Sequence, residues 1–131
     1  MQLSVAARNA IVDAIEVTAG ASPILRIRTG APPTNCAAAR TGTVLATLNL
    51  PADWMANAAN GIKTISGTWE DAAADASGVA GHFEIVQGAT CHIQGTVTAT
   101  GGGGDMEIQN TSIAAGQSIA VTGFTLTAGG A

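Results

Sequence analysis

The feature that most constrains this chain is an alternation of apolar and polar side chains that starts at Pro23. Leu25 and Ile27 alternate with Arg26 and Arg28, as in a β-strand that packs one face in the core and turns the other toward polar surroundings. The same period of two recurs in later segments separated by glycine, proline, asparagine and aspartate, which are turn residues. These segments are 44–50, 63–69, 83–85, 91–100, 106–108 and 118–127.

About seven short strands without helices between them argue against a parallel α/β sheet, which needs a crossover helix between its strands. They predict a mainly β fold, namely a single antiparallel β-sandwich or jelly-roll-like domain. We assign this β-sandwich domain to residues 21–131 and expect residues 1–20 to be a helix that docks on it or on a neighbour. The chain is then a single domain overall.

The last of these segments changes phase partway along its length. Ile119 and Val121 share one phase, whereas Phe124 and Leu126 have the opposite one, with Gly123 between the two pairs. One extra residue in a β-bulge would return all four side chains to the same face. We therefore predict a bulge at Gly123.

The N-terminal segment has the spacing of a short helix with Ser4 as its N-cap. The apolar stripe consists of Leu3, Ala7, Ile11 and Ile15, widened by Val5 and Val12. The remaining positions hold Arg8, Asn9, Asp13 and Glu16. A helix this short is marginal alone and needs a partner for its stripe. That partner is either the β domain of the same chain or a neighbouring subunit, and the sequence leaves both open.

Composition indicates a protein that is stabilised by neighbours. Charged residues make up 11% of the chain and the net charge is −4, so the clustered cations that bind phosphates are missing and we expect no nucleic-acid partner. Hydrophobic residues reach 47%, but aromatic residues only 3%, so much of the apolar fraction is alanine, which buries little area. We expect a homo-oligomer, either a dimer or a trimer.

The first residues show neither the basic nor the apolar region of a signal peptide. No stretch approaches the roughly 20 apolar residues that span a bilayer. We therefore expect the protein to be made in the cytoplasm and to have no membrane partner.

No motif predicts catalysis, a cofactor or a metal site. The run Gly101–Gly104 lacks the lysine and the helix of a phosphate-binding loop, so we interpret it as a flexible hairpin connection. Asp71 and Asp75 lack the alternating oxygen ligands of a calcium loop. His82 and His92 have no metal-binding spacing, and we interpret both as surface histidines. Without a nucleophile–base arrangement we expect no enzymatic activity.

The two tryptophans allow two interpretations. Trp54 and Trp69 could contribute to a sugar-stacking surface, but such surfaces use several aromatic side chains and this chain has few. Large aromatic side chains more commonly anchor a core. We therefore predict that both are core residues.

The two cysteines, Cys36 and Cys91, lie too far apart in the chain for a redox or zinc motif. Strict alternation over 91–100 puts Cys91 on one face with Ile93 and Val97, and His92 on the other. In a reducing cytoplasm we expect buried free thiols. A disulfide formed after release from the cell is the alternative.

Several short segments occur in a characteristic order. They read VAARNA at 5–10, DAI at 13–15, IRTG at 27–30, Pro32-Pro33, GTVLATL at 42–48, DAAADASG at 71–78, GHFEI at 81–85, GTV at 95–97 and SIAVT at 118–122. Taken together, this order resembles small virion structural proteins of tailed bacteriophages and prophages over nearly the whole chain.

The resemblance implies a capsid decoration or cement protein that binds the major capsid protein from outside and stabilises the shell non-covalently. The candidate contact residues are Leu3, Val5, Ile11, Val12 and Ile15 of the stripe, together with Arg26 and Arg28. The alternatives are internal core packing for the stripe and ordinary solvated charge for the two arginines. A tail, neck or fibre component of the virion, or a carbohydrate-binding or adhesion module, stays open as the function.

Overall fold

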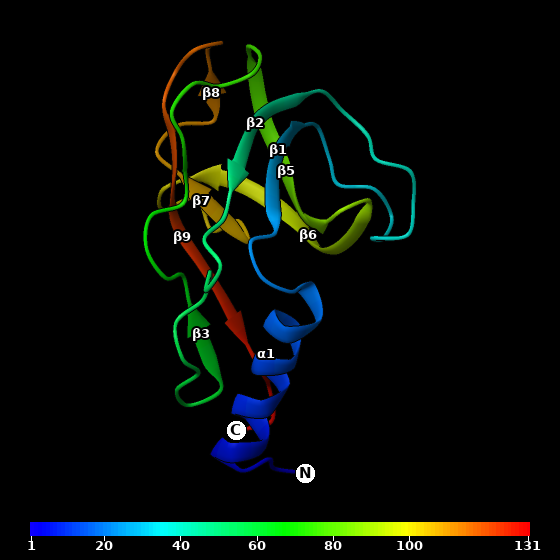
Figure 1. Ribbon diagram of the computed structural model, residues 1–131, viewed down its shortest axis with the longest axis vertical. Coiled ribbons are helices and arrows are strands. Elements are labelled where there is room, and N and C mark those ends of the chain that lie inside the picture. Colours follow the sequence, from blue (N-terminus) through cyan, green and yellow to red (C-terminus); the bar gives the residue numbers. More distant parts are fainter.

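Nine strands form one curled sheet with the helix at its lower end (Figure 1). The computed structural model describes all residues from Met1 to Ala131. The elements are α1 (Val5–Ala19), β1 (Ile24–Thr29), β2 (Val44–Asn49), β3 (Ile62–Thr64), β4 (Glu70–Asp71), β5 (Gly78–Gln87), β6 (Thr90–Ala99), β7 (Met106–Ile108), β8 (Ser112–Ile113) and β9 (Ile119–Thr127). The strand order is β2-β1-β5-β6-β7-β9-β3, with β4 paired to β9 and β8 paired to β5.

The mainly β class with one N-terminal helix is confirmed, but the two-layer sandwich or jelly roll is not. The strands belong to one continuous hydrogen-bonded network, which curls around the core instead of stacking as two sheets. The expectation of a purely antiparallel sheet is wrong, because β6 and β7 run parallel. The sheet is therefore mixed.

The glycine run explains how two consecutive strands can be parallel. Parallel neighbours usually need a connection of about a dozen residues or more, yet Val97 of β6 pairs with Met106 of β7 across the short loop 100–105. A Cβ atom on Gly102 or Gly104 would lie only 2.7 or 2.8 Å from side-chain atoms of Thr98. The hairpin interpretation was wrong: the glycines form a tight return that packs directly against β6.

The predicted bulge at Gly123 is confirmed. Glu107 of β7 pairs with Gly123 and the next residue, Ile108, pairs with Val121, so β9 contains one extra residue at this point. As a result Ile119, Val121 and Phe124 are all buried in one core cluster, and Leu126 packs against it.

The core lies on the concave side of the sheet. Leu25 and Ile27 of β1 and Phe83 and Ile85 of β5 alternate into it, as the period of two predicts. A chain of aromatic contacts crosses it, with ring centroids 5.9 Å apart for Trp54–Trp69, 5.6 Å for Trp69–Phe124 and 5.6 Å for Phe83–Phe124. Both tryptophans are at most 1% exposed, so the prediction that they anchor the core is confirmed.

The predicted strand 63–69 is shorter than expected. β3 pairs with β9 only as far as Thr64, and the chain then changes partner: Ile65 forms an isolated bridge with Met55, and the Ser66 amide donates to the Trp54 carbonyl at 3.0 Å. This change of partner brings Trp54 over the core. It also leaves Lys63 at the end of the sheet that faces α1.

The helix begins at its predicted N-cap and ends within the predicted segment 1–20. The Ser4 side chain accepts a hydrogen bond from the Ala7 amide at 3.1 Å, and Gly20 closes the helix with a positive φ of 82°. Both chain ends lie beside α1 (Figure 1), where the Leu3 amide donates to the Gly130 carbonyl at 2.6 Å. No helix of the structure is long and apolar enough to cross a membrane.

Candidate contact surfaces

Helix α1 turns its polar side chains toward the domain. Arg8 donates from Nη1 to the Asn60 carbonyl at 2.8 Å, and the Gly61 amide donates to Asn9 Oδ1 at 2.7 Å. The sequence pattern suggests the opposite orientation, in which the apolar stripe docks and the polar positions face water. The polar side docks because the last turn before β3 offers backbone groups that need hydrogen-bond partners.

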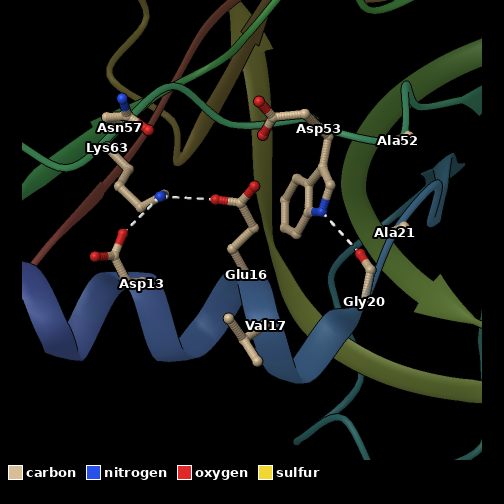
Figure 2. Close-up of a pocket in the computed structure, with 10 residues that line it drawn as sticks. Asp13, Glu16, Val17, Gly20, Ala21, Ala52, Asp53, Asn57 and Lys63 are labelled. Atoms are coloured by element: carbon tan, nitrogen blue, oxygen red, sulfur yellow. Dashed lines mark hydrogen bonds and ion pairs between the residues drawn. The ribbon is translucent and has the colours of Figure 1, made fainter.

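Lys63 is the centre of this docking contact. Its ammonium lies 2.7 Å from Asp13 Oδ1 and 2.7 Å from Glu16 Oε2, both on α1 (Figure 2). Burial alone would lower the pKa of Lys63, but hydrogen bonds and charge attraction from Glu16 and Asp13 outweigh it and hold the pKa above its ordinary value. The pair of carboxylates therefore binds one buried ammonium and fixes the helix to β3.

Beside this contact lies an open cleft of about 540 Å³ between α1 and the segment 52–57 (Figure 2). The indole N–H of Trp54 lines it but already donates to the Gly20 carbonyl at 3.0 Å. The Lys63 charge is likewise already paired with carboxylates. No group of three or more histidine, cysteine or acidic side chains in the molecule could hold a metal ion. The Trp54 indole N–H and the Lys63 ammonium thus serve the joint between helix and sheet.

The side of α1 that is turned away from these ion pairs is exposed and carries no charge, and it reaches the rim of the cleft at Val17. Seven exposed residues share this side at about 3.6 residues per turn. We call it the α1 outer face, and it consists of Ala6, Ala7, Ala10, Ile11, Ala14, Val17 and Thr18. Val17 is 79% exposed and Ile11 is 45% exposed. A solvent-facing helix surface normally carries charged and polar residues, so this face has the composition of a surface that becomes covered.

The five candidate contact residues of the apolar stripe differ in how deeply they are buried. Val12 is fully buried against the domain, whereas Leu3 and Ile15 are half-buried. Val5 and Ile11 are both 45% exposed, and of the five only Ile11 belongs to the α1 outer face.

Arg26 and Arg28 point to the convex face of the sheet, where both meet one buried carboxylate. Glu84 of β5 is fully buried, with Arg28 Nε at 3.0 Å and Arg26 Nη1 at 3.7 Å from its Oε1. A third arginine, Arg40, reaches Oε2 from Nη1 at 3.3 Å. The side chains of the three arginines are only 14–31% exposed, so the interpretation of Arg26 and Arg28 as ordinary solvated charges is wrong.

The segment 30–43 covers this cluster. It connects β1 to β2 as a long loop beside the β5–β6 hairpin (Figure 1). Arg40 holds the loop in shape because its Nη2 donates to three of the loop's own carbonyls, those of Asn35, Cys36 and Ala38. Gln94 of β6 donates to the Pro33 carbonyl at 2.7 Å. Hydrogen bonds thus stabilise the loop internally and also attach it to the sheet.

The loop also corrects the interpretation of His82. This histidine is fully buried, and its Nδ1 lies 2.9 Å from the Gly30 carbonyl, while its Nε2 has no partner. His82 points to the same convex face as Glu84, two residues further along β5. It is buried because the loop begins directly above it. His92 is half-buried.

The two cysteines meet at the edge of the same cluster. Ile85 pairs with Ile93 but Val86 pairs with Cys91, so His92 is an extra residue in β6. This bulge moves Cys91 away from the face of Ile93, contrary to strict alternation, and places its Sγ 3.4 Å from Arg40 Nη1. Cys36 comes from the covering loop, and the two sulfur atoms lie 2.7 Å apart.

Neither cysteine is fully buried, contrary to the expectation of buried thiols. Desolvation by the surrounding groups nevertheless raises the pKa of the Cys91 thiol to about 12, and the hydrogen bond and charge interaction with Cys36 act in the same direction. The nearby Arg40 opposes the shift. Cys91 is therefore a protonated thiol at neutral pH.

Sequence reasoning missed the central members of both ionic contacts, Lys63 and Glu84. A usable signal existed for Lys63, because it shares the phase of Ile65 and Trp69, which the alternation assigns to the core. For Glu84 there was no such signal, because the alternation with Phe83 and Ile85 places it on the polar face, and only the structure shows that β5 is flanked by strands on both sides. A charged residue in a central strand needs partners from elements on the same face.

Comparison of the chain with protein-family models, with curated proteins and with solved structures finds no match.

Proposed function

We propose that this protein is a capsid decoration protein of a tailed bacteriophage, which binds the major capsid protein on the outside of the shell without any catalysis. The observation that carries the proposal is the α1 outer face, an exposed helix surface without a single charged residue. The phage origin rests on the order of sequence segments that resembles small virion proteins.

The composition of the α1 outer face suits a protein contact. Its four alanines allow another backbone to approach closely, while Ile11 and Val17 supply apolar area to bury. No charge has to lose its water when the face is covered, so the desolvation penalty that opposes burial of ionic groups does not arise. Ion pairs on the inner side hold the helix to the sheet, so that it can present this face as a rigid unit.

Shell stabilisation would come from many copies acting together. Each copy contributes a modest contact, and simultaneous contacts with adjacent capsid subunits add in free energy. A homo-oligomer, whether dimer or trimer, would multiply these contacts. A jelly-roll-like shape belongs to this proposal only in the coarse sense of a curled β-sheet around one core.

Carbohydrate binding is less well supported than a protein contact. Trp54 and Trp69 are both buried in the core, so neither offers its ring to a sugar. A tail, neck or fibre position in the virion uses the same kind of protein contact, and copy number separates it from a position on the capsid.

The proposal is tested by cosedimentation of the protein with expanded capsids of the phage that encodes it. The double variant Ala10→Glu/Ala14→Lys places an i, i+4 ion pair on the α1 outer face, which keeps both helix stability and net charge. We expect at least a tenfold loss of binding with an unchanged melting temperature. The matched control is Ala114→Glu/Ala115→Lys, at exposed positions after β8 at the other end of the molecule.

Quantification of the protein in purified virions completes the test. Hundreds of copies per particle support the capsid position, whereas a few copies indicate the tail or neck. A wild-type protein that stays monomeric and fails to bind expanded capsids overturns the proposal.

A further inference from the structure

We propose that Cys36 and Cys91 form a reversible disulfide that fastens the loop 30–43 to strand β6. This inference does not depend on the proposed function, because it concerns contacts within one chain. It identifies a covalent site that joins two residues 55 positions apart in sequence.

The first support is that the folded chain already brings the two sulfur atoms together. They lie 2.7 Å apart, which is less than the van der Waals contact distance of two sulfur atoms. The approach is produced by two independent local features, the bulge at His92 that turns Cys91 toward the loop and the fold of the loop that presents Cys36.

The second support is that non-covalent contacts hold the loop in place without the bond. Arg40 reaches the Cys36 carbonyl at 3.1 Å through Nη2 and the Cys91 sulfur at 3.4 Å through Nη1. The same guanidinium is anchored on the Glu84 carboxylate. The thiols therefore meet in the reduced protein, and bond formation requires little further ordering of the chain.

The third support is that the two sulfur atoms are accessible to small reagents. Both cysteines are only half-buried, so a small molecule can reach them from the edge of the loop. Reaction with a small-molecule disulfide such as oxidised glutathione first forms a mixed disulfide on one cysteine and releases one glutathione thiol. In each step the attacking cysteine first loses its proton, and the glutathione that leaves as a thiolate takes a proton up. The second cysteine attacks the protein sulfur of the mixed disulfide and displaces the other glutathione in this way. Two protein thiols are oxidised and one reagent disulfide is reduced to two thiols.

The bond would change what keeps Glu84 covered. In the reduced protein the loop is held by ionic and hydrogen-bonded contacts around Glu84 and Gln94. In the oxidised protein a covalent link holds the same loop even when those contacts open. The link also restricts the unfolded chain, which stabilises the folded state.

The test is equilibration of the wild-type protein in glutathione buffers from fully reduced to fully oxidised, followed by intact-mass analysis and thermal melting. We expect a loss of two hydrogens in mass, no remaining thiol for an alkylating reagent, and a melting temperature higher by roughly 5–15 °C. Protease cleavage within the loop 30–43 should slow at least tenfold.

The variants Cys36→Ser and Cys91→Ser serve as controls, because each keeps one thiol and should show neither the mass change nor the rise in melting temperature. Oxidised wild-type protein that carries two glutathione adducts, or that forms disulfide-linked dimers instead of the internal link, overturns the proposal. None of these measurements involves a capsid, so their failure would leave the proposed function standing.

Discussion

Two peripheral segments, the helix α1 and the loop 30–43, are attached to the same sheet by opposite arrangements of charge. At α1, one ammonium from the sheet, Lys63, is shared by two carboxylates of the helix. At the loop, one carboxylate from the sheet, Glu84, is shared by Arg40 of the loop and by Arg26 and Arg28 of β1. In both cases the strand supplies the more deeply buried charge.

The two joints differ in how far water reaches the surrounding charges. Of the two carboxylates at the helix joint, Asp13 is 50% exposed and Glu16 is 18% exposed, whereas the three arginines at the loop joint are 14–31% exposed. Water can therefore compensate Asp13 for a lost partner, but no charge at the loop joint is open to water to the same degree. The loop, although it has no regular structure, therefore depends more strongly on its buried charge than the helix does.

The variant Glu84→Gln tests this difference most severely. It keeps the shape of the side chain but leaves the guanidinium groups of Arg28 and Arg40 without a counter-charge in a covered site. We expect a loss of about 3–5 kcal/mol in the free energy of unfolding, measured by urea denaturation, as for other broken buried ion pairs. The control is Glu70→Gln on the exposed strand β4, which should stay within about 0.5 kcal/mol of the wild type. An equal effect of the two variants would refute the central role of Glu84.

The corresponding variant at the helix joint, Lys63→Met, should have a smaller effect. The methionine fills most of the buried space, and Asp13 can turn to water once the ammonium is gone. We expect a loss of about 1–2 kcal/mol by the same measurement. Asp13→Asn should lose less than about 1 kcal/mol, because Glu16 still binds Lys63 and exposed ion pairs contribute little. If Lys63→Met lowered the free energy of unfolding more than Glu84→Gln does, the helix would depend more on its buried charge than the loop, contrary to our expectation.

Alkaline pH should weaken both joints, beginning at the loop. The pKa of Cys91 is raised from 9.0 to about 12 in the folded protein, so its stabilising contribution is complete below pH 9 and is lost as the pH rises from 9 toward 12. The pKa of Lys63 is also raised from its ordinary value of 10.5, so its contribution to stability likewise falls with rising pH, but only above pH 10.5. Melting curves of the reduced protein should therefore begin to shift down near pH 9. In Cys91→Ser the downward shift should begin later, and an unchanged onset would argue against this assignment.

The sequence predicts the strands well because their signal is local. The alternation in β1 and the phase change at Gly123 lie within a few residues of each other, so no knowledge of distant partners is needed. The burial of Trp54 and Trp69 follows from their size alone.

The sequence predicts the joints poorly because their signals are distant or ambiguous. Arg40 lies 44 positions from Glu84, and nothing near either residue indicates that a loop folds back over the sheet. The bulge at His92 has no glycine to mark it, unlike the one at Gly123, so the face of Cys91 was assigned wrongly. The parallel return after β6 has a clear glycine signal, but the same run is equally compatible with a hairpin.

That return loop has a consequence for the order in which the chain folds. Strands β5, β6 and β7 are consecutive and paired to one another through short connections, so their closure costs little chain entropy and can occur early. Strand β1 pairs with β5 far along the sequence, and β2 can join only through β1. We therefore expect β5–β7 to form the folding nucleus and to acquire the earliest amide protection in pulsed hydrogen exchange. During synthesis on the ribosome, β1 can pair with β2, but Arg26 and Arg28 would lack their carboxylate partner until β5 emerges with Glu84.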